Sequence, residues 1–257
     1  MAIKNLYLIY YSTSKPKYYY QKCHFVLGAE DKMIDDKVNI AIFNTFRTHR
    51  DTFTGEAKRQ RGIIAHLATE QSPELRTRTS IAHAIAKKHN TLWQNIYSGI
   101  FKDLDDVLIP SGVVKVEGRL PLRRGPRALQ AEGVPFYKLT ADGLLVASSI
   151  EEIGPNRIKI FESYIQSISP EDQNEKTMHM GILLLVKISP SLVFKIINRY
   201  IHAYTMGLIE NITPINIKKL GSALSTHILI EQELIKGFDG LQEDQKRLVR
   251  KFFDVIG

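Results

Sequence analysis

The sequence contains very little cysteine and no long apolar run. Cys23 is the single cysteine among 257 residues, so no internal disulfide can form, and the composition fits a reducing compartment. The longest apolar run, GILLLV at 181–186, is too short to span a bilayer. The apolar start NLYLIYY continues into STSKPKYYY without a small-residue cleavage site, which argues against a signal peptide. We therefore expect a cytoplasmic protein with no membrane partner.

Motifs of catalysis and metal binding are also missing. There is no Gly-rich phosphate loop, no Gly-x-Ser-x-Gly and no His-Glu-x-x-His. Cys23 and His24 are adjacent, but a zinc site needs further ligands at workable spacing. Two other groups could in principle bind a metal, but we expect their side chains to be solvated or hydrogen-bonded instead. They are His66, His83 and His89, and His227 with Glu231 and Glu233. The sequence predicts no metal, no cofactor and no enzymatic activity.

The positive charge is concentrated in one part of the chain. The net charge is +8, and residues 40–140 hold sixteen Lys or Arg against nine Asp or Glu, a local excess of +7. Residues 1–39 contribute +2 and residues 141–257 contribute −1. A basic total is weak evidence, because many soluble proteins are basic. A local excess is better evidence, and it favours a nucleic-acid contact within residues 40–140.

Two helices are predicted at the start of this basic part. Residues 34–50 place Val38, Ile42, Thr45 and Phe46 on one face. Residues 55–70 form a second helix with an apolar inner face of Ile63, Ile64 and Leu67. Its outer face would carry Lys58, Arg59 and Arg61, which could lie against phosphate or simply be solvated. Ser72 and Pro73 then have the composition of a helix start.

A helix, a sharp turn and a second helix follow from about Arg76. Ile81, Ala82, Ile85 and Ala86 form one apolar stripe. Thr77 or Thr79 can cap its start, and the cations Lys87 and Lys88 suit the negative end of a helix. Asn90 can adopt the left-handed conformation that a sharp turn needs.

The next helix, from Leu92 to about Leu104, has two unlike faces. We expect Thr91 to cap it, and an inner face of Leu92, Ile96, Ile100, Asp103 and Val107, with Leu104 nearby. Asp103 alone interrupts this apolar stripe. The opposite face is polar and suits base edges and phosphates in a major groove, with Thr91, Gln94, Asn95, Ser98 and Lys102. Trp93 and Tyr97 lie one turn apart and more often pack beside such a helix than stack on DNA.

A hairpin with a long basic tip comes next. The runs VVKVEG at 113–118 and VPFYKLT at 134–140 have strand composition. Pro121, Gly125 and Pro126 exclude a helix between them. An arm that contacts phosphates or a minor groove is indicated by four arginines, Arg119, Arg123, Arg124 and Arg127. Thr140 then caps a further helix, ADGLLVASSI.

This order of elements resembles a winged helix-turn-helix. The segment FYKLTADGLLVA at 136–147 is similar to the "Y-x-L-T-x-x-G" end of the wing in many winged-helix transcription regulators. The resemblance covers roughly residues 54–150 and implies that Thr140 starts the last helix, with Gly143 in its first turn. Two features depart from the family. The segment DDVLIPSGV at 105–113 is longer than usual and contains Pro110, and the wing is longer as well.

The remainder of the chain has a helical composition throughout. Helix starts are predicted at Ser169-Pro170, Ser189-Pro190 and Thr213-Pro214, and Gly240 precedes the last helix. A helix before these starts, at 156–168, would have an apolar face of Ile158, Phe161, Ile165 and Ile168. We predict a mostly α fold with a small β-hairpin wing. It divides into a poorly defined segment at 1–33, a winged helix-turn-helix domain with its preceding helix at 34–153, and an all-helical domain at 154–257.

These features together predict sequence-specific binding of double-stranded DNA, with transcription regulation as the role and the nucleoid as the location. The resemblance and the near-neutral helical part favour a homodimer. The identity of any small-molecule effector stays open. A protein-interaction adaptor that uses a winged helix to hold a protein partner is the alternative, and a nucleic-acid-processing enzyme is a weaker one.

Overall fold

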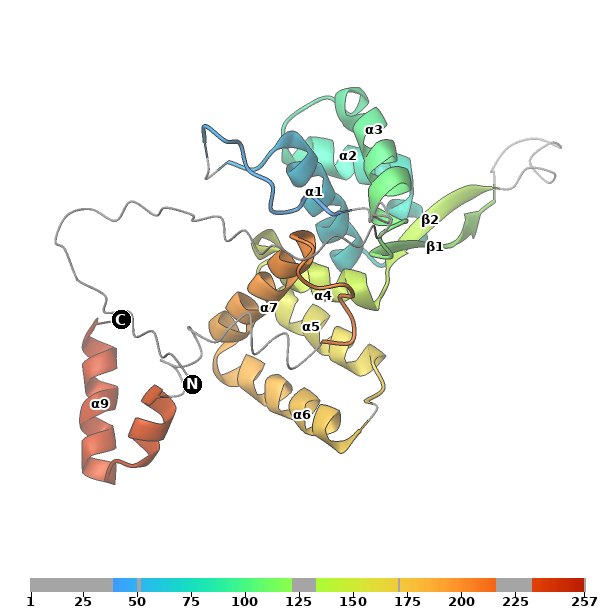
Figure 1. The fold of residues 1–257 in the computed structure, drawn as a ribbon. Helices are drawn as coiled ribbons and strands as arrows, with labels where there is room; N and C mark the ends of the chain where they lie inside the picture. Colours follow the sequence, from blue (N-terminus) through green and yellow to red (C-terminus); the bar gives the residue numbers. More distant parts are fainter. Residues whose placement is uncertain (1–38, 50–51, 122–132, 171, 216–232, 257) are drawn as a thin grey trace, which may run out of the picture. The chain divides into compact units, whose positions relative to one another are not determined.

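The structure is a computed structural model that describes residues 39–49, 52–121, 133–170, 172–215 and 233–256. Its described parts are mostly helical, with one small antiparallel hairpin, so the predicted fold class is confirmed (Figure 1). The hairpin is β1 (Val114–Leu120) and β2 (Val134–Leu139). The helices are α1 (Gly55–Thr69), η1 (Pro73–Arg76), α2 (Arg78–Lys88), α3 (Trp93–Lys102), η2 (Asp103–Leu108), α4 (Ala141–Ser148), η4 (Glu151–Ile153), α5 (Asn156–Ser167), α6 (Gln173–Ile188), α7 (Pro190–Thr205) and α9 (Glu243–Ile256).

Local signals in the sequence set the ends of α1 and α2. The Thr54 hydroxyl accepts a hydrogen bond from the Ala57 amide, and the Thr77 hydroxyl accepts one from the Ser80 amide. After α2, Asn90 has a φ of 50°, the left-handed conformation expected there. The predicted cap at Thr91 is wrong: α3 starts at Trp93, and Leu92 is its N-cap residue without a side-chain hydrogen bond.

The helix that contains α3 continues without a break into η2, a wider π-helical turn. Ile100, Leu104 and Leu108 are fully buried on its inner side. Leu92 was predicted to share this inner side but is 67% exposed, because the helix begins only after it.

The hairpin joins this group of helices to α4. Val114 pairs with Leu139 and Leu120 pairs with Val134, with one irregularity between Val116 and Gly118. The Thr140 hydroxyl accepts a hydrogen bond from the Gly143 amide and caps α4, as predicted. A Cβ atom on Gly143 would lie 2.1 Å from the Val113 carbonyl oxygen, so only glycine allows α4 to start this close to the hairpin.

The predicted helix at 34–50 is wrong for its described part. Residues 39–49 are not helical, and Thr45 forms a β-bridge with Phe53. Ile40 and Ile42 are buried, and the Ala41 amide donates to the Gln60 Oε1 atom over 2.7 Å. Ala41 is buried as well, and residues 42–43 form a turn, so the contact with α1 here outweighs the weak helical pattern.

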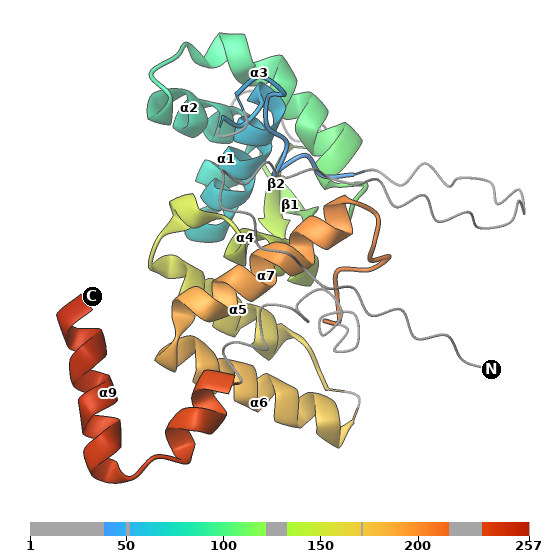
Figure 2. The ribbon, with the colours of Figure 1, turned by 60° about the vertical axis from the view of Figure 1, so that its left-hand side comes forward.

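Three helices, α5, α6 and α7, continue the fold beyond α4. Phe161 and Ile165 of α5 are buried, and α4 packs against both α5 and α7 (Figure 2). The start of α7 at Ser189-Pro190 is confirmed. The start at Ser169-Pro170 is wrong, since α6 begins at Gln173, where the Asp172 carboxylate accepts from the Glu175 amide. No helix starts at Thr213-Pro214 within the described residues, which end there at Ile215.

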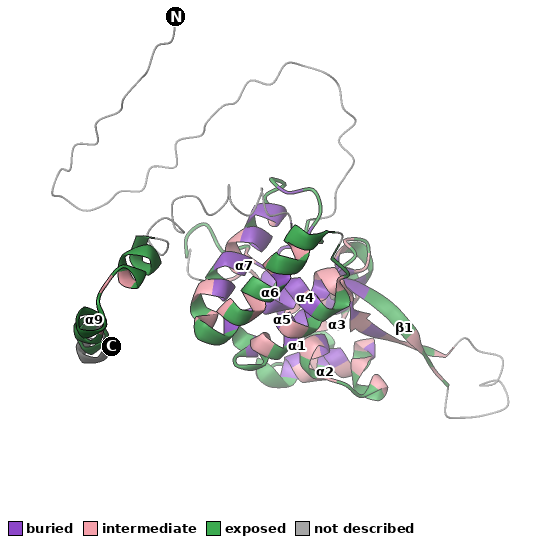
Figure 3. Cartoon of the chain, turned by 90° about the horizontal axis from the view of Figure 1, so that it is seen from below, coloured by how far each residue is buried: buried purple, intermediate pink, exposed green. Residues whose placement is uncertain are grey.

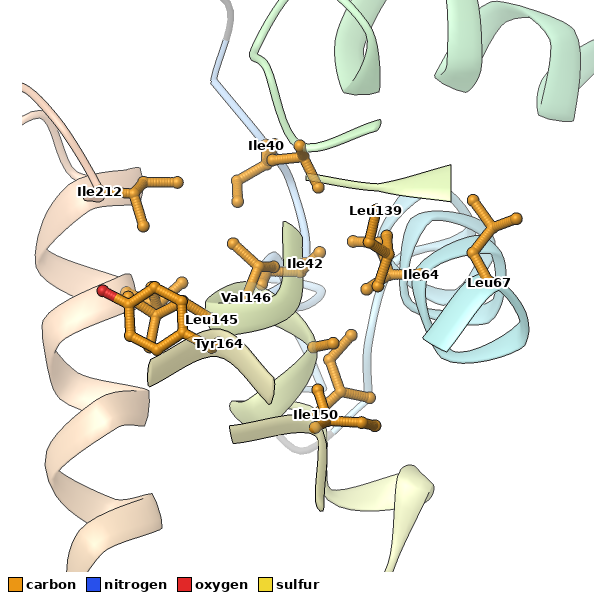
Figure 4. Close-up of a cluster of buried hydrophobic side chains, with 14 of the residues drawn as sticks. Ile40, Ile42, Ile64, Leu67, Leu139, Leu145, Val146, Ile150, Tyr164 and Ile212 are labelled. Carbon is orange, nitrogen blue, oxygen red and sulfur yellow. The ribbon is translucent and has the colours of Figure 1, made fainter. Parts of the chain in front are cut away.

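One hydrophobic cluster unites the elements from Ile40 to Ile215. Figure 4 shows part of it, where Ile42, Ile64 and Leu139 lie near Leu145 and Val146 of α4. Tyr164 of α5 and Ile212, which follows α7, belong to the same cluster. Residues on both sides of the predicted boundary at 153 therefore share a core. Among the helices of the described ranges, none has the length and apolar content to cross a bilayer.

Candidate nucleic-acid interface

The polar face of α3 is exposed along its whole length. Thr91, Gln94, Asn95, Ser98 and Lys102 are all exposed, while Ile100 is fully buried on the opposite side. Residues 91–102 contain no Asp or Glu. The face therefore presents amide and hydroxyl groups and one cation, which can hydrogen-bond to base edges or phosphates without repelling them.

A buried ion pair fixes α3 against α1. Asp103 is 2% exposed, and its Oδ2 atom accepts a hydrogen bond from the Arg59 Nε atom over 2.7 Å. Arg59 passes so close to α3 that a Cβ atom on Gly99 would lie 2.6 Å from its Nε atom. This contact explains the single charge in the apolar stripe, because a buried carboxylate needs a partner. It also sets the rotation of α3, and with it the direction of the polar face.

A second side of α3 carries a row of aromatic rings, with His83 of α2 at one end. The Trp93 and Tyr97 ring centroids lie 5.2 Å apart, and those of Tyr97 and Phe101 lie 4.5 Å apart. The His83 ring centroid lies 4.7 Å from that of Trp93. We call His83, Trp93, Tyr97 and Phe101 the aromatic row. Trp93 and Tyr97 thus pack beside the helix, and both keep part of their surface exposed.

Arg78 closes this row at the hairpin end. Its guanidinium lies 4.4 Å from the Phe101 ring centroid, and its Nε atom donates to the Tyr137 hydroxyl over 2.5 Å. Its Nη2 atom pairs with Asp105 of η2. Arg78 therefore ties α2, α3 and β2 together. Burial raises the pKa of Tyr137 even though Arg78 opposes the shift, so the hydroxyl stays protonated.

The base of the hairpin is held by charges of its own. Glu117 of β1 accepts from Lys138 of β2 and from Arg76, both over 2.6 Å. The hydrogen bond from Lys138, together with Arg76, holds the pKa of Glu117 below its ordinary value despite some burial. Arg119 is exposed further along β1, and its Nη1 atom donates to the Gly133 carbonyl over 3.3 Å. Arg123, Arg124 and Arg127 lie outside the described residues.

Arg61 does not face outward as predicted. It is 6% exposed, pairs with Glu152 through Nη2, and donates from Nη1 to the Ile42 carbonyl over 3.2 Å. Burial raises the pKa of Glu152, but hydrogen bonds from Arg61 and from the Glu152 backbone, together with the nearby cations, leave it below its ordinary value. Arg59, Arg61, Arg76 and Arg78 therefore all serve internal ion pairs. Three of the four partner carboxylates lie within residues 40–140 and are already subtracted in the +7 excess, so only the pair of Arg61 with Glu152 offsets one charge of it.

The remaining predicted cations lie at the surface. Lys87 and Lys88 are exposed at the end of α2, next to the turn at Asn90, and Lys102 is exposed at the end of α3. Sequence reasoning missed the partners of Arg59 and Arg78, which are 44 and 27 residues away in the chain. The one available signal was Asp103 itself, a charge in an apolar stripe that demands a cation.

The part of the chain with described coordinates contains no group of three or more His, Cys, Asp or Glu side chains that could hold a metal ion. In the comparisons with known proteins, no family model, no curated protein and no solved structure matches this chain. Its function therefore has to be argued from the residues on this surface.

Proposed function

We propose that residues 39–150 form a winged helix-turn-helix domain that binds double-stranded DNA and that the protein regulates transcription at the nucleoid. The observation that carries the proposal is the exposed face of Gln94, Asn95, Ser98 and Lys102 on α3, free of carboxylates and backed by a fully buried face. A helix with these two faces can enter a major groove while its back remains in the protein core.

The four polar side chains have different tasks in this proposal. The side-chain amide of Gln94 can donate one hydrogen bond to an adenine and accept another from it, and that of Asn95 can do the same at a neighbouring adenine. Such a contact distinguishes an A·T pair from the other pairs. Ser98 can reach a base or a phosphate. Lys102, with Lys87 and Lys88 at the end of α2, neutralises phosphates and contributes to binding of any sequence.

Rigid support of α3 favours sequence reading over loose electrostatic binding. Asp103 and Arg59 fix the helix rotation from the inside, and Arg78 fixes its position relative to β2. A side chain must keep its position to within a fraction of an ångström to make a bidentate contact with a base. The internal ion pairs therefore support the proposed function although they touch no DNA.

The hairpin takes the role of the wing. Arg119 is exposed on β1, and the sequence between the strands adds Arg123, Arg124 and Arg127. Arginines on a projecting arm bind phosphates and narrow minor grooves, where the negative potential is strongest. We assign them affinity rather than sequence preference.

A protein-interaction adaptor is the second candidate, and the aromatic row favours it. Trp93, Tyr97 and Phe101 are half-buried, and aromatic side chains of this kind are common anchors in protein interfaces. The two candidates use different sides of α3. A partner protein would cover the aromatic row, whereas DNA would cover the polar face.

The experiment combines binding with selection. Trp93 is the only tryptophan and sits in the first turn of α3, so its fluorescence should change on binding to duplex DNA. Sequences selected from a random duplex pool should converge on a motif for the wild type. Gln94→Ala and Asn95→Ala should each relax one or two positions, a loss of about 1–3 kcal/mol in discrimination. Gln173→Ala, an exposed glutamine at the start of α6, is the matched control and should select the wild-type motif.

The salt dependence separates base contacts from phosphate contacts. Replacing Lys102 by alanine should reduce the slope of log K against log salt by about 0.9 if it contacts one phosphate. Gln94→Ala should leave this slope unchanged. If the wild type binds no duplex DNA at low salt, or if all polar variants select one and the same motif, α3 does not read DNA.

A further inference from the structure

The last helix, α9, is strongly amphipathic and displays its apolar side. Leu248 and Phe252 are four residues apart, which places them on one side of the helix. Leu248 is 67% exposed and Phe252 is 59% exposed. Figure 3 shows most of α9 coloured as exposed. We call Leu248 and Phe252 the α9 stripe. An apolar stripe exposed to this degree is typical of a surface that another element covers.

A capping hydrogen bond stabilises the start of α9. The Gln242 amide donates to the Gln245 side chain over 3.0 Å, a capping contact at the helix start. Residues 233–239 are also helical, and the Arg250 guanidinium lies 5.5 Å from the Phe238 ring centroid. Leu234 and Ile235 in that helix are 52% and 53% exposed. The contact of Arg250 with Phe238 joins the two helices on the Arg250 side of α9, so Leu248 and Phe252 on the other side stay exposed.

The charges beside the stripe indicate what covers it. Asp244 and Lys251 are seven residues apart, so both lie along the same edge of the stripe, and both are exposed. When two copies of α9 lie antiparallel, Asp244 of each copy comes beside Lys251 of the other. A parallel two-fold pair would instead set this edge of one helix against the opposite edge of the other, so Asp244 and Lys251 would not face each other across the contact. The charge order is therefore self-complementary in the antiparallel arrangement alone.

Another apolar stripe of the same chain fits α9 less well. On α6, Met180, Leu184 and Ile188 are 59%, 61% and 80% exposed. Lys176 and Lys187 run along the edge of that stripe, and the cations of α9 would meet them there. A lipid surface is also a poor match, because α9 carries four Lys or Arg against three Asp or Glu.

We propose that two chains associate through their α9 helices, packed antiparallel about a two-fold axis near Leu248. This pairing goes beyond the proposed DNA binding and does not depend on it. Fourteen residues of helix extend over about 21 Å. Such a contact is smaller than the interface of a permanent dimer, so the dimer should dissociate on dilution in the micromolar range.

The test measures the mass of the full chain by sedimentation over a range of concentrations. The wild type should shift from the 29.3 kDa monomer toward twice that mass as concentration rises. Leu248→Asp should remain monomeric, because a carboxylate would be buried in the apolar contact. Leu184→Asp on α6 is the matched control and should dimerise like the wild type.

Charge reversal tests the antiparallel order itself. Asp244→Lys places two lysines at each edge contact, and Lys251→Asp places two aspartates there. Each variant alone should dimerise about tenfold or more weakly than the wild type. An equal mixture of the two variants should recover the dimer, because every contact again joins opposite charges. Both variants should still change Trp93 fluorescence with DNA, which separates a failure of this pairing from a failure of DNA binding.

Three outcomes would overturn the proposal. The first is a wild-type chain that stays at 29.3 kDa throughout. The second is a dimer that Leu184→Asp abolishes and Leu248→Asp does not, which would assign the interface to α6. The third is a monomer that binds anionic phosphatidylserine vesicles through Leu248, which would assign α9 to a lipid surface.

Discussion

Two regions of this molecule are stabilised in different ways. The hairpin region, residues 39–150, is crossed by ion pairs between elements, such as Arg59 with Asp103 and Arg76 with Glu117. The helical region, residues 156–215, buries large side chains such as Phe161 and Tyr200. Apolar burial is strong but non-directional, whereas ion pairs fix register and rotation. The comparison teaches that ion pairs such as Arg59 with Asp103 and Arg78 with Asp105 surround α3, the helix that carries the proposed DNA-binding face.

The largest expected effect tests whether the two regions are separate at all. Phe161 is fully buried in the cluster that runs from Ile40 to Ile215. Phe161→Ala should lower the free energy of unfolding by about 3–5 kcal/mol, because it removes a buried ring and leaves a cavity. Urea unfolding should be followed by Trp93 fluorescence, which reports the hairpin region, and by circular dichroism, which reports all helices.

Coincident midpoints for both probes are expected in the wild type and in the variant, because one core serves both regions. A Trp93 midpoint that Phe161→Ala leaves in place would contradict this and would favour independent folding on either side of residue 153. Glu162→Ala, a neighbouring position on the less buried side of α5, is the control and should shift the midpoint little.

The second effect tests the directional contacts. Arg59→Met leaves Asp103 buried without its cation, and the free energy of unfolding should fall by about 3 kcal/mol. Replacing both residues, Arg59→Met with Asp103→Leu, should recover most of this stability, since no charge then remains buried. Denaturant titration measures the stability of both variants.

The double variant also tests whether the ion pair orients α3, separately from its effect on stability. If the ion pair sets the rotation of α3, the double variant should select a less defined DNA motif than the wild type at equal stability. An unchanged motif would show that packing alone orients α3. The ion pairs of the hairpin region would then have no role in DNA reading.

A third effect compares one glycine from each region. Gly143→Ala should cost about 1–3 kcal/mol, because the new Cβ atom would lie 2.1 Å from the Val113 carbonyl oxygen. Gly181→Ala in α6 meets nothing within 4 Å and should instead stabilise the helix by about 0.5–1 kcal/mol. Thermal unfolding of the two variants gives opposite shifts if the comparison is right. Two losses of similar size would mean that α6 is covered by another surface.

Local patterns in the sequence predicted most helices and strands. They could not predict which distant residues pair with one another. Thr77, Asn90 and Thr140 act on residues within a few positions of themselves, so the sequence shows their roles directly. The close approach of Gly143 to Val113, 30 residues earlier, is not local in this way. The inward position of Arg61 depends on Glu152, 91 residues away, and no local pattern encodes that.

The failed predictions share a related cause. The segment at 39–49 has a weak helical pattern, but its contact with Gln60 of α1 decides its conformation. At the start of α6, a Ser-Pro pair and an Asp cap compete within four residues, and the Asp cap at Asp172 wins. In the candidate site, exposure of the α3 face followed from periodicity, while the aromatic row and the Arg59 support required the tertiary structure.

The smallest expected effect compares two carboxyl groups that respond to pH in opposite ways. Asp142 in the first turn of α4 accepts from the Thr213 hydroxyl, and burial raises its pKa despite that hydrogen bond. The folded state then binds the proton more tightly than the unfolded state. Stability from this group is present below the unfolded pKa of about 3.9 and is lost as pH rises through the folded pKa.

Asp142→Asn removes the charge and keeps an acceptor for Thr213, so it should be more stable than the wild type at neutral pH. This gain should shrink as pH falls.

Glu117 in the hairpin should behave in the reverse sense. Lys138 and Arg76 hold its pKa below the ordinary value, so its stabilising effect is present above the unfolded pKa of about 4.3 and is lost as pH falls through the folded pKa. Glu117→Gln should therefore be less stable than the wild type at neutral pH, and the difference should close toward acid. Thermal unfolding of both variants and the wild type between about pH 4 and pH 8 measures the two trends.

If Asp142→Asn is less stable than the wild type by a constant amount across this range, the ionised Asp142 carboxylate stabilises the folded state. The hairpin and α4 would then respond to charge alike, because the salt-bridged Glu117 and the half-buried Asp142 would both favour the ionised form.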